Sequence, residues 1–420
     1  MIVNTNDVKP QKNLETKEAH DNRILARITL ITSLGDFLSL FAMIKLLMDS
    51  GLSVFVAGYA VVIKTAAVGI SGVILPRVVS KYNTRTLIRA SQWLSFFSVV
   101  TVVGAYWAHH LNVTLVFSAL FIQTLLKQIF DSTREYHSKV VGENQCPVTF
   151  QSQLLSSFYS AQVIGPLVSM ALILAFRIEI PLLLDAGSFL IAGAMASRLR
   201  TTVQPLVSLN VLRPLSYLIK YPQLLRLTLL RSIGFWFSIS LFNYLLFSVV
   251  TQKFHLEVER SAWFYSVLGL GATLSISCIR NPLTGILTRV GKLNEGYLAF
   301  VGQLAFGLAL LGFVAFNSFV SVIVVLFFAG LGMGMNAVGT QALRRKLTTP
   351  EQFPEIVALE TLIARSTDVA IATAAGFTIA SGAMTSNTWI VLAALNFFVC
   401  GAAHLSFLPK KTRLTSAVST

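Results

Sequence analysis

Two charged side chains interrupt long apolar stretches near the start of the chain. Asp36 lies about twelve residues into the segment 24–48. Lys64 lies about eleven residues into the next segment, 53–76. At 1.5 Å per residue of helix, each would stand about 17 Å from the membrane surface, close to the bilayer midplane. A charge at that depth costs about 2.5–3.5 kcal/mol even on lenient scales, so we expect the two residues to form a site.

Two interpretations of this opposed pair stay open. Asp36 and Lys64 could form a static salt bridge that holds two helices together. Alternatively, Asp36 could take up a proton and release Lys64, as a proton-coupled switch would. Burial favours the neutral form of a carboxyl group and a nearby cation favours the charged form, so the balance would change with conformation.

Charged residues also stand inside later apolar segments. Arg365 and Asp368 are three residues apart and can pair on one helix face. This pair could line a central cavity, or it could neutralise itself within the helix packing. Lys127 and Asp131, followed by Arg134, lie toward one end of another segment. We expect these three residues, together with the adjacent Glu135, to act as a gate or as interfacial anchors.

The elements that must position these side chains are membrane-spanning helices. The chain is 54% hydrophobic and only 12% charged, whereas a soluble domain has roughly 25% charged residues. Its apolar runs reach the length of about 20 residues that crosses a bilayer as a helix, and they lack the alternation of membrane strands. We therefore expect an all-α membrane protein of twelve helices, near 24–48, 53–76, 87–108, 111–133, 154–176, 179–197, 224–250, 261–280, 296–316, 318–340, 356–381 and 388–408.

The basic residues predict the orientation of these helices. Most of the 33 Lys and Arg residues lie in every second connection, and cytoplasmic loops are the ones enriched in Lys and Arg. Both termini are therefore expected in the cytoplasm. Because the net charge of +15 is concentrated at segment ends, it indicates topology and not a nucleic-acid partner.

The longest connection divides the chain into two halves. It runs over 200–223 and contains Pro205, Pro214 and Pro222. We expect five regions, which are a polar cytoplasmic tail (1–23), a six-helix bundle (24–199), a cytoplasmic linker (200–223), a second six-helix bundle (224–408) and a second cytoplasmic tail (409–420). Two related bundles around a central site are a transporter architecture.

The sequence offers no pattern of catalysis or metal binding. Cys146, Cys278 and Cys400 are scattered, and the six histidines have no ligand spacing. Neither a nucleophile with its base nor a phosphate-binding Walker loop is present, so we expect neither an enzyme nor a cofactor. Without an ATPase motif, transport would be driven by an ion gradient. A membrane-embedded enzyme or a receptor is the third and least favoured class.

Several motifs follow one another in a characteristic order. Gly35-Asp36 is followed by Gly165-Pro166, where we expect a helix bend, and then by the string LDAGSFL at 184–190. Asp185 within that string is interpreted as a capping or packing residue. The Gly-rich string AGLGMGMNA follows at 329–337. In this order and spacing, the set resembles the major facilitator superfamily, and within it the drug and siderophore efflux branch that includes macrolide and enterobactin exporters.

One loop departs from the pattern of that family. The family motif between the second and third helices normally has a Gly and an Asp, where this chain has Pro76 and Ser80. The basic positions Lys81 and Arg85 are retained, and we expect them to belong to a cytoplasmic gate.

The resemblance implies a secondary transporter that works by alternating access. It implies proton-coupled export of a small organic molecule, either a drug-like compound or a siderophore, by a monomer in the bacterial inner membrane with protons and membrane lipids as further partners. The alternative is a lysophospholipid transporter of the same fold. Aromatic and amide residues of the seventh segment could line the substrate cavity or face lipid, namely Phe235, Trp236, Asn243 and Tyr244.

Overall fold

The computed structural model describes most of the helical part of the chain. The described residues are 8–49, 55–141, 147–201, 203, 218–236, 242, 245–246, 250, 253–254, 260–280, 295–349 and 352–407. Within them, nine helices are long and apolar enough to cross a membrane. The prediction of an all-helical membrane protein is thereby confirmed, whereas the number twelve stays a prediction.

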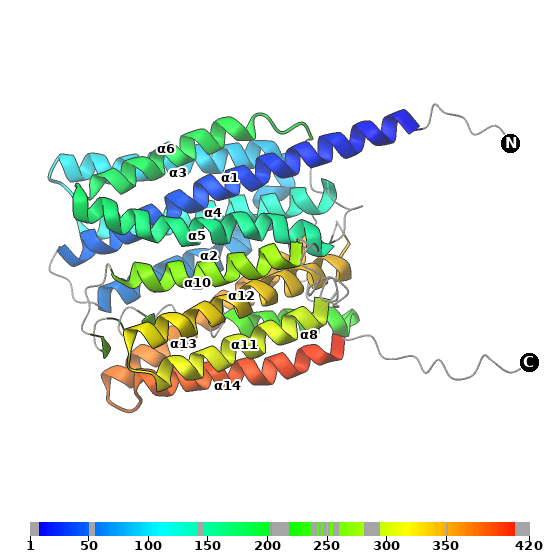
Figure 1. Ribbon diagram of the computed structural model, residues 1–420. Helices are drawn as coiled ribbons and strands as arrows, with labels where there is room; N and C mark the ends of the chain where they lie inside the picture. Colours follow the sequence, from blue (N-terminus) through cyan, green and yellow to red (C-terminus); the bar gives the residue numbers. More distant parts are fainter. Residues whose placement is uncertain are drawn as a thin grey trace, which may run out of the picture.

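The N-terminal half consists of six long helices that lie roughly side by side (Figure 1). Helix α1 packs against α5 and α6, α3 packs between α4 and α6, and α2 packs against α4. The bounds are α1 (Val8–Asp49), α2 (Phe55–Lys81), α3 (Thr84–Trp107), α4 (Val113–Val141), α5 (Pro147–Ala175) and α6 (Glu179–Ala196). Helix α1 begins within the predicted polar tail, since residues such as Glu15, Lys17 and Ala19 favour a helix.

The described part of the C-terminal half also consists mainly of long helices. Helix α12 packs against α10 and α11, and α14 packs against α11. The bounds are α8 (Pro222–Leu229), the π-helical turn η1 (Leu230–Trp236), α10 (Ser261–Arg280), α11 (Glu295–Ala315), α12 (Phe319–Leu347), α13 (Phe353–Ala380), α14 (Ser386–His404) and the 3₁₀ turn η3 (Leu405–Phe407). The predicted seventh segment therefore starts as an α-helix and widens into a π-helix, a form often found at functional sites.

Short polar caps allow tight connections between consecutive helices. The side chain of Asn83 accepts a hydrogen bond from the Thr86 N–H at 2.8 Å and caps α3. Asn112 accepts one from the Leu115 N–H at 2.8 Å at the start of α4. Such caps satisfy N–H groups that have no partner within the helix, so each chain reversal needs only a few residues.

Among the described helices, the two halves meet mainly along two helix pairs, with smaller contacts of α5 with α12 and of α4 with α13. Helix α2 of the first half packs against α13 of the second, and α5 packs against α10. At the second pair a Cβ added to Gly269 would stand 3.0 Å from the backbone of Gln162 and Val163. Gly269 therefore permits a close approach of the two halves that larger residues would prevent.

The first residue of α1 and the last residue of α14 lie at the same end of the helical body (Figure 1), hereafter the termini end. The buried Asp21 anchors the chain after α6 to α1 there. Its carboxylate accepts hydrogen bonds from the N–H groups of Arg200 and Thr201, each at 2.9 Å, and from the Thr201 hydroxyl. On the other half, Leu218 is buried against Leu224 and Ile356. Each half thus holds one end of the connecting segment.

Candidate functional site

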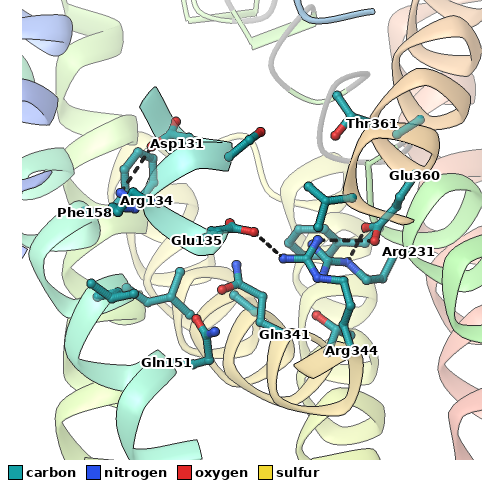
Figure 2. Close-up of a pocket in the computed structure, with 18 of the residues that line it drawn as sticks. Asp131, Arg134, Glu135, Gln151, Phe158, Arg231, Gln341, Arg344, Glu360 and Thr361 are labelled. Carbon is teal, nitrogen blue, oxygen red and sulfur yellow. Dashed lines mark hydrogen bonds and ion pairs between the residues drawn. The ribbon is translucent and has the colours of Figure 1, made fainter. Parts of the chain in front are cut away.

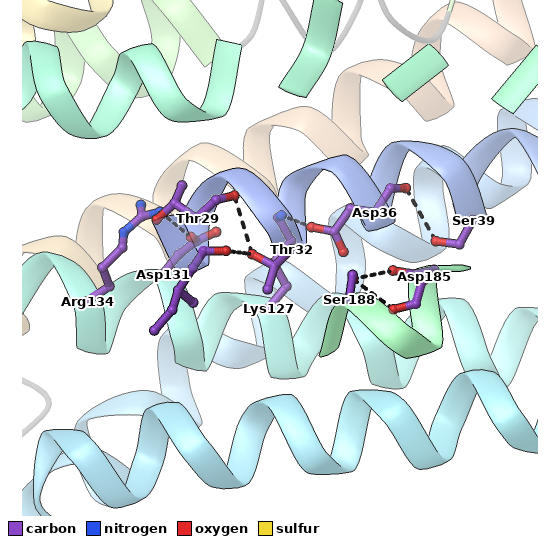
Figure 3. A network of polar contacts seen from close by, with 10 residues as sticks. Thr29, Thr32, Asp36, Ser39, Lys127, Asp131, Arg134, Asp185 and Ser188 are labelled. Atoms are coloured by element: carbon purple, nitrogen blue, oxygen red, sulfur yellow. Dashed lines mark hydrogen bonds and ion pairs between the residues drawn. The ribbon is translucent and has the colours of Figure 1, made fainter. Parts of the chain in front are cut away.

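Asp36 of α1 forms an ion pair with Lys127 of α4 in the interior of the N-terminal half (Figure 3). The side chains are 23% and 27% exposed, respectively, so water screens the pair only in part. The backbone carbonyl of Asp36 also accepts a hydrogen bond from the Ser39 hydroxyl at 3.3 Å. Sequence depth suggested Lys64 as the ion-pair partner of this carboxylate. In the structure its ion-pair partner is Lys127.

Lys64 lies beside this pair. A recess of about 180 Å³ between α1, α2 and α4 is lined by Asp36, Lys64 and Lys127, together with the polar residues Ser39, Gln123 and Thr124. Two cations and one carboxylate therefore share one small recess. The structure brings Asp36 and Lys64 to the same place, as their depths predict, and adds a second lysine that sequence reasoning had placed nearer the cytoplasm.

The recess adjoins a central cavity of about 370 Å³ between the two halves. Lys64, Thr124, Lys127 and Phe158 line both spaces. The other charged residues in the wall are Asp131 and Arg365. Aromatic side chains from both halves form much of the remainder, namely Phe37, Phe158, Tyr159, Phe235, Phe242, Tyr265 and Phe306. This volume lies within the range of about 300–1,000 Å³ of ligand pockets in proteins.

Most charged groups around the cavity have a charged partner. Asp131 pairs with Arg134 at 3.2 Å. Arg134 also donates to the Thr29 hydroxyl at 2.9 Å, which ties α4 to α1 (Figure 3). Arg365 and Asp368 form the expected pair along one face of α13, at 2.7 Å. Among the cavity-lining cations that the structure describes, Lys64 is the one without an ion pair to a carboxylate.

A second polar pocket of about 190 Å³ lies toward the termini end and contains a network that joins the two halves (Figure 2). Arg344 of α12 pairs with Glu135 of α4 at 2.5 Å and with Glu360 of α13 at 3.3 Å. Glu360 in turn pairs with Arg231 of η1 at 2.7 Å. We name these four residues the inter-half network. Three of them, Arg231, Arg344 and Glu360, are at most 5% exposed.

Two further basic residues strengthen the same junction. Lys139 of α4 donates to the backbone carbonyl of Arg345 at 2.6 Å. Arg345 of α12 donates to the carbonyl of Ser138 at 2.8 Å. Basic residues at segment ends predict topology, and on that basis the sequence did not indicate that Arg344 and Arg345 join the two halves. The signal that could have found this junction is the presence of Glu135 and Glu360 at matching depths in the two halves.

The predicted gate residues around the loop after α2 do not take part in the inter-half network. Lys81 is exposed at the last residue of α2, and Arg85 is half-buried in the first turn of α3. The ion pairs of the inter-half network involve neither of them. A gating role for these two residues stays a prediction.

The helix-bend motif and the string at 184–190 both lie against α1. A Cβ on Gly165 would stand 2.6 Å from the Cβ of Phe37, so α5 and α1 touch at this glycine. Helix α5 continues through Pro166, and the bend there stays a prediction. Asp185 is fully buried and lies next to Ser188, whose hydroxyl donates to the Asp185 backbone carbonyl at 2.7 Å. Its position fits the packing interpretation.

The predicted aromatic cavity residues are described only in part. Phe235 lies in η1, is buried and lines the central cavity. Trp236 ends the same π-helical turn, and its side chain is outside the described part of the structure. Asn243 and Tyr244 also lie outside the described residues. Within the described part of the chain, no group of three or more acidic, His or Cys side chains could hold a metal ion.

Comparisons with known proteins place this geometry in a family. The family model described as Major Facilitator Superfamily matches residues 25–363. No curated protein sequence matches the chain. Three solved structures share the fold at low sequence identity, as follows.

The human organic anion transporter MFSD10 (TETRAN) has 13% identity and a TM-score of 0.65 over 92% of this chain and 98% of that chain. A bacterial homologue of the iron transporter ferroportin in an outward-facing state has 16% identity and a TM-score of 0.63 over 92% and 99%. The Major Facilitator Superfamily transporter FucP in the outward conformation has 12% identity and a TM-score of 0.70 over 94% and 100%.

Proposed function

Since the chain belongs to the major facilitator superfamily, we propose that it is a proton-coupled transporter that exports a small organic molecule by alternating access. A drug-like compound or a siderophore is the proposed cargo. The ion pair between Asp36 and Lys127, in the recess that adjoins the central cavity, is the observation that carries the proposal. A titratable carboxylate at mid-membrane depth, next to the space that a substrate would occupy, is what a proton-coupled exporter needs.

The proposed coupling follows from the charges in the recess. When a proton neutralises Asp36, Lys127 loses its counter-charge and stays beside Lys64 in the same recess. An uncompensated buried charge is costly, which favours a conformation that gives these lysines water or another partner. Release of the proton restores the ion pair. Protonation of Asp36 thereby changes the relative free energies of the two conformations, which couples proton uptake to the rearrangement of the helices.

The inter-half network supports an alternating-access cycle. Its ion pairs join α4 to α12, and through Arg344 and Glu360 they reach α13 and η1 at the termini end. The two halves cannot separate there unless the pair between Glu135 and Arg344 breaks. If both termini are cytoplasmic, as the distribution of basic residues predicts, this conformation is closed toward the cytoplasm.

A membrane potential supplies enough energy for such export. One elementary charge that moves down about 150 mV releases about 3.5 kcal/mol, from about 2.3 kcal/mol per 100 mV. At about 1.4 kcal/mol per tenfold, this supports roughly a 300-fold substrate gradient before any contribution from a pH difference.

Proton movement in inverted membrane vesicles tests the proposal. A panel of drug-like compounds and siderophores is added to vesicles with an acidified lumen, and the lumenal pH is followed with a fluorescent dye. A transported compound should raise the lumenal pH in wild-type vesicles and not in Asp36→Asn vesicles. The matched control is Asp49→Asn, at the exposed end of the same helix, which should behave as wild type. Transport without any proton movement would refute antiport and favour the lysophospholipid alternative.

A further inference from the structure

We infer that the central cavity binds an amphipathic organic anion, with its acidic group in the recess beside Lys64 and Lys127 and its apolar part against the aromatic wall. This inference rests on the proposed function in taking the cavity as the substrate site. It adds the chemical class of the substrate, which the proposed function leaves open.

The charge of the recess is the first argument. Asp36, Lys64 and Lys127 line it, so the carboxylate compensates only one of two lysines. The charged groups of the wider cavity wall, Asp131 and Arg365, are paired with Arg134 and Asp368. Lys64 is partly buried and forms no ion pair of its own with a described residue, and an anionic ligand would supply a direct partner for its ammonium group.

The second argument is a hydrogen-bond donor in the same recess. Gln123 lines it, and within the described part of the chain the nitrogen of its side-chain amide is buried and has no hydrogen-bond partner. A buried donor without a partner is unfavourable, and an acceptor oxygen that enters the recess would satisfy it after a small rotation of the side chain. Carboxylate, sulfonate and phosphate groups offer several such oxygens.

The shape and lining of the cavity are the third argument. Phe158 lies where the recess meets the cavity, with its ring centroid 6.0 Å from that of Phe37 and 5.1 Å from that of Tyr159. Beyond it, Phe242 and Phe306 of the second half stand 6.4 Å apart between centroids. A ligand with one acidic end and one aromatic or aliphatic body therefore matches the order of polar and apolar wall.

The ion pair makes this inference specific. Lys127 already binds the Asp36 carboxylate, so a ligand anion in the recess competes with Asp36 for the same ammonium group. Neutralising Asp36 should therefore strengthen anion binding, whereas it should abolish proton-driven transport. A general loss of structure would weaken both.

Equilibrium binding to the purified full-length protein tests the inference without any transport step. Naphthalene-2-sulfonate is the anionic probe, and a naphthylmethyl-trimethylammonium salt carries a similar ring with the opposite charge. Calorimetric titration should show at least tenfold tighter binding of the sulfonate to the wild-type protein. Lys64→Gln should weaken sulfonate binding at least tenfold, Lys64→Arg should keep it within about threefold, and Asp36→Asn should tighten it.

Lys45→Gln is the matched control. Lys45 pairs with Asp49, the last residue of α1, and lines neither the recess nor the cavity. It should leave the affinity for the sulfonate unchanged. Equal affinity of the two probes, no saturable sulfonate binding, or an unchanged affinity in Lys64→Gln would overturn the inference. The comparison of the two probes on the wild-type protein decides even if Lys64→Gln fails to fold. Proton-coupled transport of a cation with no binding of the sulfonate would refute the anion and leave the proposed function intact.

Discussion

Glu135 of α4 and Arg344 of α12 form an ion pair of 2.5 Å that joins the two halves of the molecule. Arg344 is 5% exposed at its side chain and also contacts the ring of Phe353, with 5.1 Å from its guanidinium carbon to the ring centroid. Breaking a buried pair by removal of one partner typically costs about 3–5 kcal/mol. Together with the hydrogen bonds of Lys139 and Arg345 across the same junction, this contact therefore helps to hold the termini end closed.

The first prediction concerns that contact. In Glu135→Gln, Arg344 keeps Glu360 and loses its contact with the N-terminal half. We expect the conformation open at the termini end to become at least tenfold more populated, which corresponds to about 1.4 kcal/mol. Spin labels on cysteines at the exposed positions Lys81 and Gln223, with the native cysteines replaced, would report it as a longer distance.

The control for this prediction lies within one half. Lys346 of α12 pairs with Glu295 of α11 at 3.5 Å and is 60% exposed. Glu295→Gln should leave the distance distribution as in the unchanged protein, because no contact between halves is lost. The same distribution in Glu135→Gln would show that the network does not hold the termini end closed.

The second prediction separates the structural role of the Asp36–Lys127 pair from its coupling role. Lys127→Gln leaves a half-buried carboxylate without its cation, and we expect a loss of about 1–3 kcal/mol, between values for exposed and buried pairs. The double variant Asp36→Asn with Lys127→Gln should regain most of that stability and still lack proton-driven transport. Thermal unfolding of Asp36→Asn, Lys127→Gln and the double variant gives the interaction energy. Transport by the double variant would return the pair to a purely structural role.

The third prediction concerns the contact between α5 and α1. A Cβ in Gly165→Ala would meet Phe37 at 2.6 Å, so Phe37 must shift and we expect about 1–3 kcal/mol of destabilisation. Gly187→Ala is the control in the neighbouring helix, where an added Cβ meets nothing within 4 Å. It should be neutral or stabilising by up to about 1 kcal/mol from helix propensity. Equal unfolding temperatures of the two variants would contradict the close approach.

The fourth prediction concerns the anchor after α6. Asp21→Ala leaves the N–H groups of Arg200 and Thr201 without their acceptor, which costs about 1–3 kcal/mol when such donors are buried. We expect a lower unfolding temperature and faster proteolysis of the segment that joins the halves. Asp49→Ala, an exposed residue of the same helix, should change stability by no more than about 1 kcal/mol.

The positions of most helices could be predicted from the sequence. The segment 261–280 coincides with α10, and 179–197 differs from α6 by one residue at its end. Membrane helices are set by single long apolar runs, so their bounds follow from composition. The polar ends of some helices, such as the first turns of α1 and the end of α12, cannot be predicted from apolar run length, because helix propensity and tertiary contacts determine them.

The location of the site could be predicted from the sequence, but the ion pairs within it could not. The depths of Asp36 and Lys64 predicted that they would meet, and they line one recess. The choice of Lys127 as the partner depends on how α1, α2 and α4 rotate about their axes. Hydrophobic periodicity does not fix that rotation in helices that are apolar almost all round. The contact of Glu135 with Arg344 joins residues 209 positions apart, and no local pattern encodes it.

The anchors on either side of the connecting segment have a mechanical consequence. Asp21 holds the chain at Thr201, and the cluster around Leu218 holds it on the other half. The stretch between these points can span roughly 60 Å, since each residue contributes at most about 3.3–3.6 Å. The covalent connection therefore limits the separation of these two anchors only at about that length. At shorter separations, the relative position of the two halves is determined by non-covalent contacts such as those of the inter-half network.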